Sequence, residues 1–156
     1  MNQQEKHNCR SLPVVGIGLG DPSGVGPEIV AKLVVQERLM THGTQYADSR
    51  FDVSMDGANS SAKISSRSVA RDNSKQMFYS NLIGNAACSG HTECDAIIMD
   101  NAYVMARPEL SANHVDASLI HEAAIGKIAG EQLIKLMTLG LTEAEAEEQI
   151  VAGFLK

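Results

Sequence analysis

The sequence predicts a mainly β fold that begins with a strand–helix segment and ends in two helices. Between residues 51 and 110, apolar and polar residues alternate over short runs, a period that is typical of β-strands. Turn-forming residues interrupt these runs at short intervals, and helical spacing of apolar residues begins near residue 130. This periodicity fits a hairpin-rich sandwich and a β-solenoid equally well.

The amino-terminal segment, residues 13–38, is predicted to form a strand, a glycine-rich turn and a helix. Pro27 stands where the first turn of a helix tolerates proline. One face of this helix would carry Ile29, Leu33 and Val34. The glycines match neither the dinucleotide-binding fingerprint nor a P-loop, so generic nucleotide binding is not indicated.

The middle of the chain is predicted to consist of short strands. Their alternating apolar positions are Phe51, Val53, Met55, Ala62, Ile64, Met77, Tyr79, Ala96, Ile98, Val104, Ala106 and Leu110. The turns between them are rich in Asp, Asn and Gly, which are frequent turn residues, and lie at residues 56–59, 72–74, 84–85, 100–101 and 113–116.

Two helices are predicted at the carboxyl end. The first covers residues 131–137 and is closed by Gly140, which suits a left-handed cap. Thr142 and Glu145 form a capping box that starts the second, whose inner face carries Ile150, Val151, Phe154 and Leu155. We therefore divide the chain into an amino-terminal segment with a junction (1–45), a β region (46–128) and a helical region (129–156).

Composition narrows the class of protein. The 156 residues carry a net charge of −6 without a basic run, which argues against nucleic-acid binding. No apolar run is long enough for a membrane span. Three cysteines, without a secretory leader, indicate free thiols in a reducing compartment. We expect a cytoplasmic protein.

The stretch CSGHTEC carries Cys88, His91 and Cys94 at three-residue spacing. It offers at most three ligands, whereas a structural zinc site uses four, so a closed zinc clip is not favoured. If a strand begins near Thr92, Cys94 lies near its start, where solvent still reaches the thiol. The alternative is a small buried thiol, which is the usual state of a free cysteine.

His121 and Glu122 form an adjacent imidazole and carboxylate in an otherwise apolar segment. Neighbours in a strand point to opposite faces. A carboxylate that points inward needs a partner or a raised pKa, which would indicate a functional site. The alternative is an edge strand on which both groups are solvated.

The amino-terminal motif resembles that of one enzyme family. Residues 18–29 read GLGDPSGVGPEI, which is similar to the start of the hydroxythreonine-phosphate dehydrogenase (PdxA) family. The resemblance covers only residues 13–38, and the later metal-binding histidines of that family are not found. It implies a fragment of a metal- and NAD-dependent dehydrogenase.

The rest of the chain, residues 51–156, carries a second set of recognisable strings: SRSVA (66–70), DNSK (72–75), GHTECDA (90–96), HEAAIGKI (121–128), and GLTEAEA (140–146) leading to IVAGF (150–154). With these strings the segment resembles the carboxy-terminal core of the SufB/SufD family of iron–sulfur cluster assembly scaffolds. The resemblance implies a truncated right-handed parallel β-helix followed by a small helical domain.

The same resemblance implies a site and partners. Cys94, His121 and Glu122 fall on the positions that the family associates with nascent cluster assembly at the contact between two subunits, and Cys88 is interpreted as structural. Thiolate is the state that binds iron, so Cys94 would hold iron transiently in an iron–sulfur cluster completed by partner ligands. The partners would be a SufB/SufD-type subunit and, at the helical end, a SufC-type ABC ATPase.

We therefore interpret the chain as a chimera of a dehydrogenase start and a truncated scaffold, acting as a scaffold and not as an enzyme. Truncation would impair its activity if the missing turns are needed. The alternatives are a dehydrogenase fragment and an inactive chimeric product.

Overall fold

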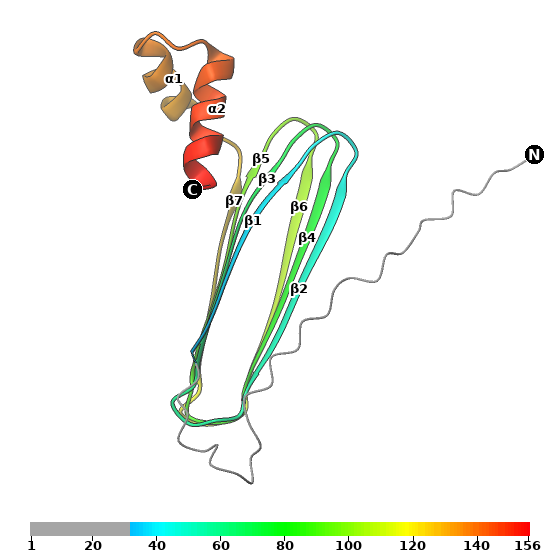
Figure 1. Ribbon diagram of the computed structural model, residues 1–156, viewed down its shortest axis with the longest axis vertical. Helices are drawn as coiled ribbons and strands as arrows, with labels where there is room; N and C mark the ends of the chain where they lie inside the picture. The colour runs from blue at the N-terminus through cyan, green and yellow to red at the C-terminus, as the bar shows by residue number, and fades with distance from the viewer. Residues whose placement is uncertain (1–31) are drawn as a thin grey trace, which may run out of the picture.

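The computed structural model describes residues 32–156 as a two-sheet β-solenoid followed by two helices (Figure 1). The strands are β1 (Lys32–Thr41), β2 (Tyr46–Met55), β3 (Ser61–Ala70), β4 (Lys75–Gly84), β5 (Ser89–Ile98), β6 (Tyr103–Ala112) and β7 (Ser118–Gly126). Sheet A has the order β1-β3-β5-β7, sheet B has the order β2-β4-β6, and all neighbours are parallel. The chain alternates between the sheets, so each pair of strands makes one turn of the solenoid. The solenoid and the helices after it confirm the predicted fold class.

The register advances by one turn of 28 or 29 residues: Lys32 pairs with Ser61, Ser61 with Ser89, and Ser89 with Ser118. One turn region carries a repeated cap. The Asp72 carboxylate accepts the Gly43 N–H (2.6 Å), and the Asp100 carboxylate accepts the Asp72 N–H (2.9 Å).

The three residues of this series have positive φ, with 60° at Gly43, 57° at Asp72 and 54° at Asp100. Glycine and aspartate tolerate this left-handed conformation better than most residues. The turn sequence therefore holds each turn of the solenoid to the previous one.

The core lies between the two sheets. Its central cluster contains Ile64, Phe78, Leu82 and Cys94, and a second cluster contains Met55, Ala62 and Cys88. Alternate residues of each strand point into this space because side chains alternate across a strand. The predicted apolar alternation corresponds to the inward positions of β2, β3, β5 and β6. On β4 the prediction is out of phase: Met77 and Tyr79 point outward, and Phe78 and Leu82 fill the core instead.

The helices α1 (Gly130–Thr138) and α2 (Glu143–Phe154) follow β7. Thr142 and Glu145 make the predicted capping box. Gly140 adopts the predicted left-handed conformation, with a φ of 97°. α2 packs through Val151 against Val69 of β3 and Met99 after β5. It therefore covers the outer face of sheet A near the carboxyl ends of the strands. None of the helices in residues 32–156 is long and apolar enough to cross a membrane.

The helix predicted to run through residue 38 is wrong over residues 32–38, which belong to β1 and pair in register with β3. Leu33 and Val35 point inward with alternating burial, so the local period is two. The ladder with β3 outweighs the helical pattern of a short segment. The predicted strand and turn before residue 32 lie outside the described residues. The β region was predicted to begin at residue 46. Because β1 covers Lys32–Thr41, sheet A begins before that predicted boundary.

Candidate functional site

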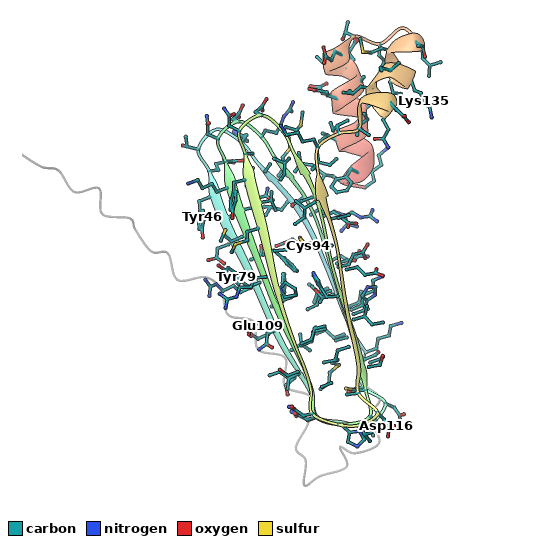
Figure 2. The ribbon with its side chains drawn as sticks, turned by 180° about the vertical axis from the view of Figure 1, so that it is seen from behind. Tyr46, Tyr79, Cys94, Glu109, Asp116 and Lys135 are labelled. Atoms are coloured by element: carbon teal, nitrogen blue, oxygen red, sulfur yellow. The ribbon has the colours of Figure 1, made fainter. Side chains whose placement is uncertain are left out.

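Cys94 lies in the middle of β5 with its side chain between the two sheets (Figure 2). It is 1% exposed and packs against Ile64, Phe78 and Leu82. Burial raises the pKa of its thiol to about 11, and the nearby Asp95 and Glu37 carboxylates add to the rise. The expectation of an accessible thiol at a strand start is therefore wrong. At neutral pH the closed solenoid holds Cys94 as a thiol.

The CSGHTEC stretch is mostly strand and does not form a closed clip. Cys88 precedes β5, and His91 and Cys94 point to opposite faces of that strand because their positions differ by an odd number. Cys88 and Cys94 both point inward but are six residues apart, about 20 Å along an extended strand. Within residues 32–156, no group of three or more His, Cys, Asp or Glu side chains could hold a metal ion.

His121 lies on β7 beside Thr92 of β5 in the ladder. Its side chain shares the inward face with Cys94, whose own ladder partner on β7 is Ala123. Burial lowers the pKa of His121. Both His121 Nδ1 and the Thr92 hydroxyl are buried without a hydrogen-bond partner among the described residues, so two buried polar atoms lie unpaired between β5 and β7.

Glu122 points away from the core, with its side chain 66% exposed. Its carboxylate lies 3.2 Å from His91 Nε2. The structure thus brings Cys94 and His121 to the inner face of adjacent strands, and Glu122 to the outer face with His91. A buried carboxylate at position 122 is excluded, and the solvated alternative describes this residue.

The roles that the structure gives to His91 and Glu37 were not predicted from the sequence. His91 was weighed only as a zinc ligand. Glu37 points inward from β1 and accepts hydrogen bonds from Ser66 (2.7 Å) and Ser49 (2.5 Å). Ser66 is the ladder partner of both Glu37 and Cys94, so a polar column crosses the core. The sequence did offer a signal for Glu37, because it is a charged residue at an inward position of the alternating segment that forms β1.

Comparisons with known proteins show which family the chain resembles. The sequence profile described as "SUF system FeS cluster assembly, SufBD core domain" matches residues 27–154. An iron-sulfur cluster assembly SufBD family protein of Methanothermobacter thermautotrophicus (strain Delta H) is 36% identical over 127 residues, which cover 80% of this chain and 31% of the relative. A SufBD family protein of Pyrococcus horikoshii is 33% identical over 152 residues, 96% of this chain and 44% of the relative.

The fold places this protein in the class of two-sheet parallel β-solenoids. It has a buried cysteine between the sheets and a helical carboxyl end. The chain belongs to the SufBD core-domain family. It spans about a third to under a half of the length of the curated relatives named above. Similarity to this family extends into the amino-terminal segment, and neither finding supports the dehydrogenase resemblance of residues 13–38.

Proposed function

We propose that this chain is a scaffold component of SUF iron–sulfur cluster assembly, and not a catalyst, and that it contributes Cys94, His121 and Glu122 at a contact between two subunits. The family match carries the assignment to cluster assembly. The placement of Cys94 and His121 on the inner face of the last two strands of sheet A supports the site. The free thiols of Cys88 and Cys94 are consistent with a reducing cytoplasm.

The free edge of β7 supports the subunit contact. Among residues 32–156, β7 is hydrogen-bonded on one side only, to β5, and it contains no proline. An unpaired strand edge offers N–H and C=O groups to a strand of another chain. By contrast, β6 at the edge of sheet B carries Pro108, which cannot donate to a ladder. A SufB/SufD-type subunit would therefore pair along β7.

The cluster would be transient and completed by the partner. Only two cysteines lie in residues 32–156, and the separation along β5 is too large for both to bind one small cluster. Iron is the cargo here, and its thiolate ligand must first become accessible. Because β5 is the one strand that pairs with β7 in the described range 32–156, local opening of β7 costs less than opening of an inner strand. Opening β7 uncovers the inner face of β5 at Cys94.

The helical end supports a second partner. α1 has no buried residue and exposes Ile134 (62%) and Met137 (43%), and its C-cap residue Leu139 is 77% exposed. Apolar side chains gathered on one short helix are typical of a protein-binding surface. We assign this surface to the SufC-type ABC ATPase.

Anaerobic reconstitution with iron and sulfide, in the presence of a SufC-type ATPase and a SufB/SufD-type subunit, tests the proposal. Visible absorption of an iron–sulfur cluster is expected with the parent chain and lost with Cys94→Ser, since serine removes the soft ligand. Cys88→Ser is the matched control, and it should retain the absorption. The reverse pattern would contradict the assignment of Cys94. NAD-dependent oxidation by the chain would favour the dehydrogenase alternative.

A further inference from the structure

The outer face of sheet B gathers all three tyrosines of the chain: Tyr46 on β2, Tyr79 on β4 and Tyr103 on β6. Tyr46 is 62% exposed and Tyr103 50% exposed, and Figure 2 shows Tyr46 and Tyr79 on the outside of the solenoid. The sheet A side differs, because α2 packs there. Tyrosine and arginine are enriched where proteins bind one another, so this face has the composition of an interface.

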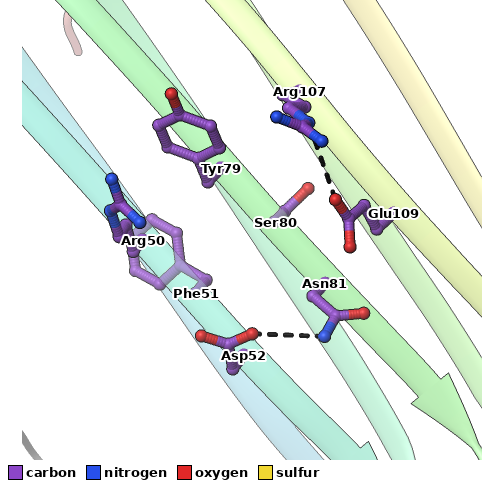
Figure 3. Close-up of a pocket in the computed structure, with 8 residues that line it drawn as sticks. All are labelled: Arg50, Phe51, Asp52, Tyr79, Ser80, Asn81, Arg107 and Glu109. Carbon is purple, nitrogen blue, oxygen red and sulfur yellow. Dashed lines mark hydrogen bonds and ion pairs between the residues drawn. The ribbon is translucent and has the colours of Figure 1, made fainter.

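Two rows of opposite charge cross this face. The ladder places Arg50, Tyr79 and Arg107 in one row across β2, β4 and β6. The adjacent row, two residues further along each strand, contains Asp52, Asn81 and Glu109. A hollow of about 150 Å³ lies between the two rows (Figure 3).

The two arginines of the positive row are held differently within the chain. The Arg50 guanidinium binds both oxygens of Asp48 at 3.0 Å and stacks 4.5 Å from the centroid of Tyr79. Arg107 lies 3.6 Å from Glu109, and both side chains are 60% exposed or more. Exposed pairs of this kind contribute little to stability, so Arg107 and Glu109 are free to exchange partners at low cost.

The two rows are self-complementary. A two-fold axis that runs parallel to the rows and between them places the positive row of one copy against the negative row of the other, strand for strand. Such an isologous contact uses the same patch on both subunits. We propose that the outer face of sheet B binds the same face of a second copy of this chain, with Arg107 against Glu109 of the partner subunit. This contact is separate from the β7 edge and independent of cluster assembly.

The size of the face sets the expected strength. Three ten-residue strands cover roughly 33 Å by 14 Å at the usual rise and strand spacing. The two copies would then bury about 900 Å² in total, which is below the size of a stable interface and within the range of transient ones. We expect a weak dimer that salt weakens further, since exposed charges are screened.

Sedimentation equilibrium of the full chain tests this inference, with Ile120→Lys added to block pairing along β7. The parent should form a weak dimer at low salt. Arg107→Glu and Glu109→Arg each place like charges opposite one another and should each raise the dimer dissociation constant at least about tenfold. An equimolar mixture of these two variants should restore dimers, because each then supplies the charge that the other lost.

The mixture separates a lost contact from a lost fold, and circular dichroism of each variant checks folding. Tyr79→Ala should weaken the dimer without changing charge. Arg38→Glu, a similar reversal on the exposed face of sheet A, is the matched control and should leave the dissociation constant unchanged. A monomeric parent at all concentrations, or a mixture that stays monomeric, would overturn the proposal, the first outcome leaving the face to a different protein.

Discussion

β5 and β7 are neighbours in the same sheet, yet they differ completely in burial. In β5 the inward residues Gly90, Thr92, Cys94 and Ala96 are buried, whereas β7 has no buried residue although its sequence SLIHEAAIG is the more apolar of the two. The two strands are in register and present the same alternation. The difference is a second neighbour: in the part of the chain that the structure describes, β5 has strands on both sides and β7 on one. Burial in a solenoid therefore depends on position in the stack more than on composition.

The largest effect should separate an inner isoleucine from one on β7. Ile64 of β3 is fully buried and Ile125 of β7 is 38% exposed. Ile64→Ala should lower the free energy of unfolding by about 2–5 kcal/mol, since it leaves a cavity. Ile125→Ala should cost less than about 1 kcal/mol, because it removes little buried area. Urea denaturation measures both, and equal losses would show that β7 is covered in solution.

The next prediction compares the stability effects of replacing a glycine in β5 and a glycine in β7. A Cβ on Gly90 of β5 would lie 2.9 Å from Leu119 Cδ2, 2.9 Å from Met55 Cε and 3.0 Å from Leu82 Cδ1. Gly90→Ala should therefore destabilise the fold by about 1–3 kcal/mol through overpacking. Gly126 at the end of β7 has no atom within 4 Å of the same position, so Gly126→Ala should be neutral or slightly stabilising. Thermal unfolding compares the two variants, and a neutral Gly90→Ala would indicate a looser core.

Cys94→Ser tests how the core around the proposed site on β5 tolerates a polar group. Cys94 lies in the core, so replacing its thiol should change the free energy of unfolding. A buried hydroxyl without a partner costs about 1–3 kcal/mol, so Cys94→Ser should be less stable than Cys94→Ala by a measurable amount in urea. The reverse order would mean that the new hydroxyl finds a partner in the polar column of Glu37 and Ser66.

The smallest effect lies in α2, outside the solenoid. Hydrogen bonds from the Thr142 backbone N–H and then from its hydroxyl lower the pKa of Glu145. Because the folded pKa is below the unfolded value of about 4.3, this stabilisation is present above that value and is lost as the pH falls through the folded pKa. Helix content by circular dichroism should decline over this range. Thr142→Ala should weaken the pH dependence, and an unchanged profile would exclude the capping box as its source.

The sequence predicts most of the strands and both helices because their patterns are local. Alternation identified the strands from residue 51 onward, and the capping box identified α2. β1 was misread because Glu37 breaks its inward apolar pattern, and because its stabilising partner, β3, lies 29 residues away in sequence.

The site was predicted less well. The flanking charges His91, Glu93 and Asp95 alternate with Thr92, Cys94 and Ala96, and this pattern indicates that Cys94 faces the core. The separation of Glu122 from His121 follows from the same alternation. The contact of His91 with Glu122 depends on the register of β5 and β7, which no local pattern specifies.

The repeated turn cap allows the solenoid to lose or gain one complete turn at a time. Deleting residues 72–99 would remove one complete turn and join Asp100 to Arg71, so that the Asp100 carboxylate would occupy the place where Asp72 now caps Gly43. The join would keep the same kind of residue, the same left-handed backbone and the same bond to the previous turn. Solenoids of this type can therefore be lengthened or shortened by recombination without the design of a new junction, provided that the exchanged segment is a whole turn.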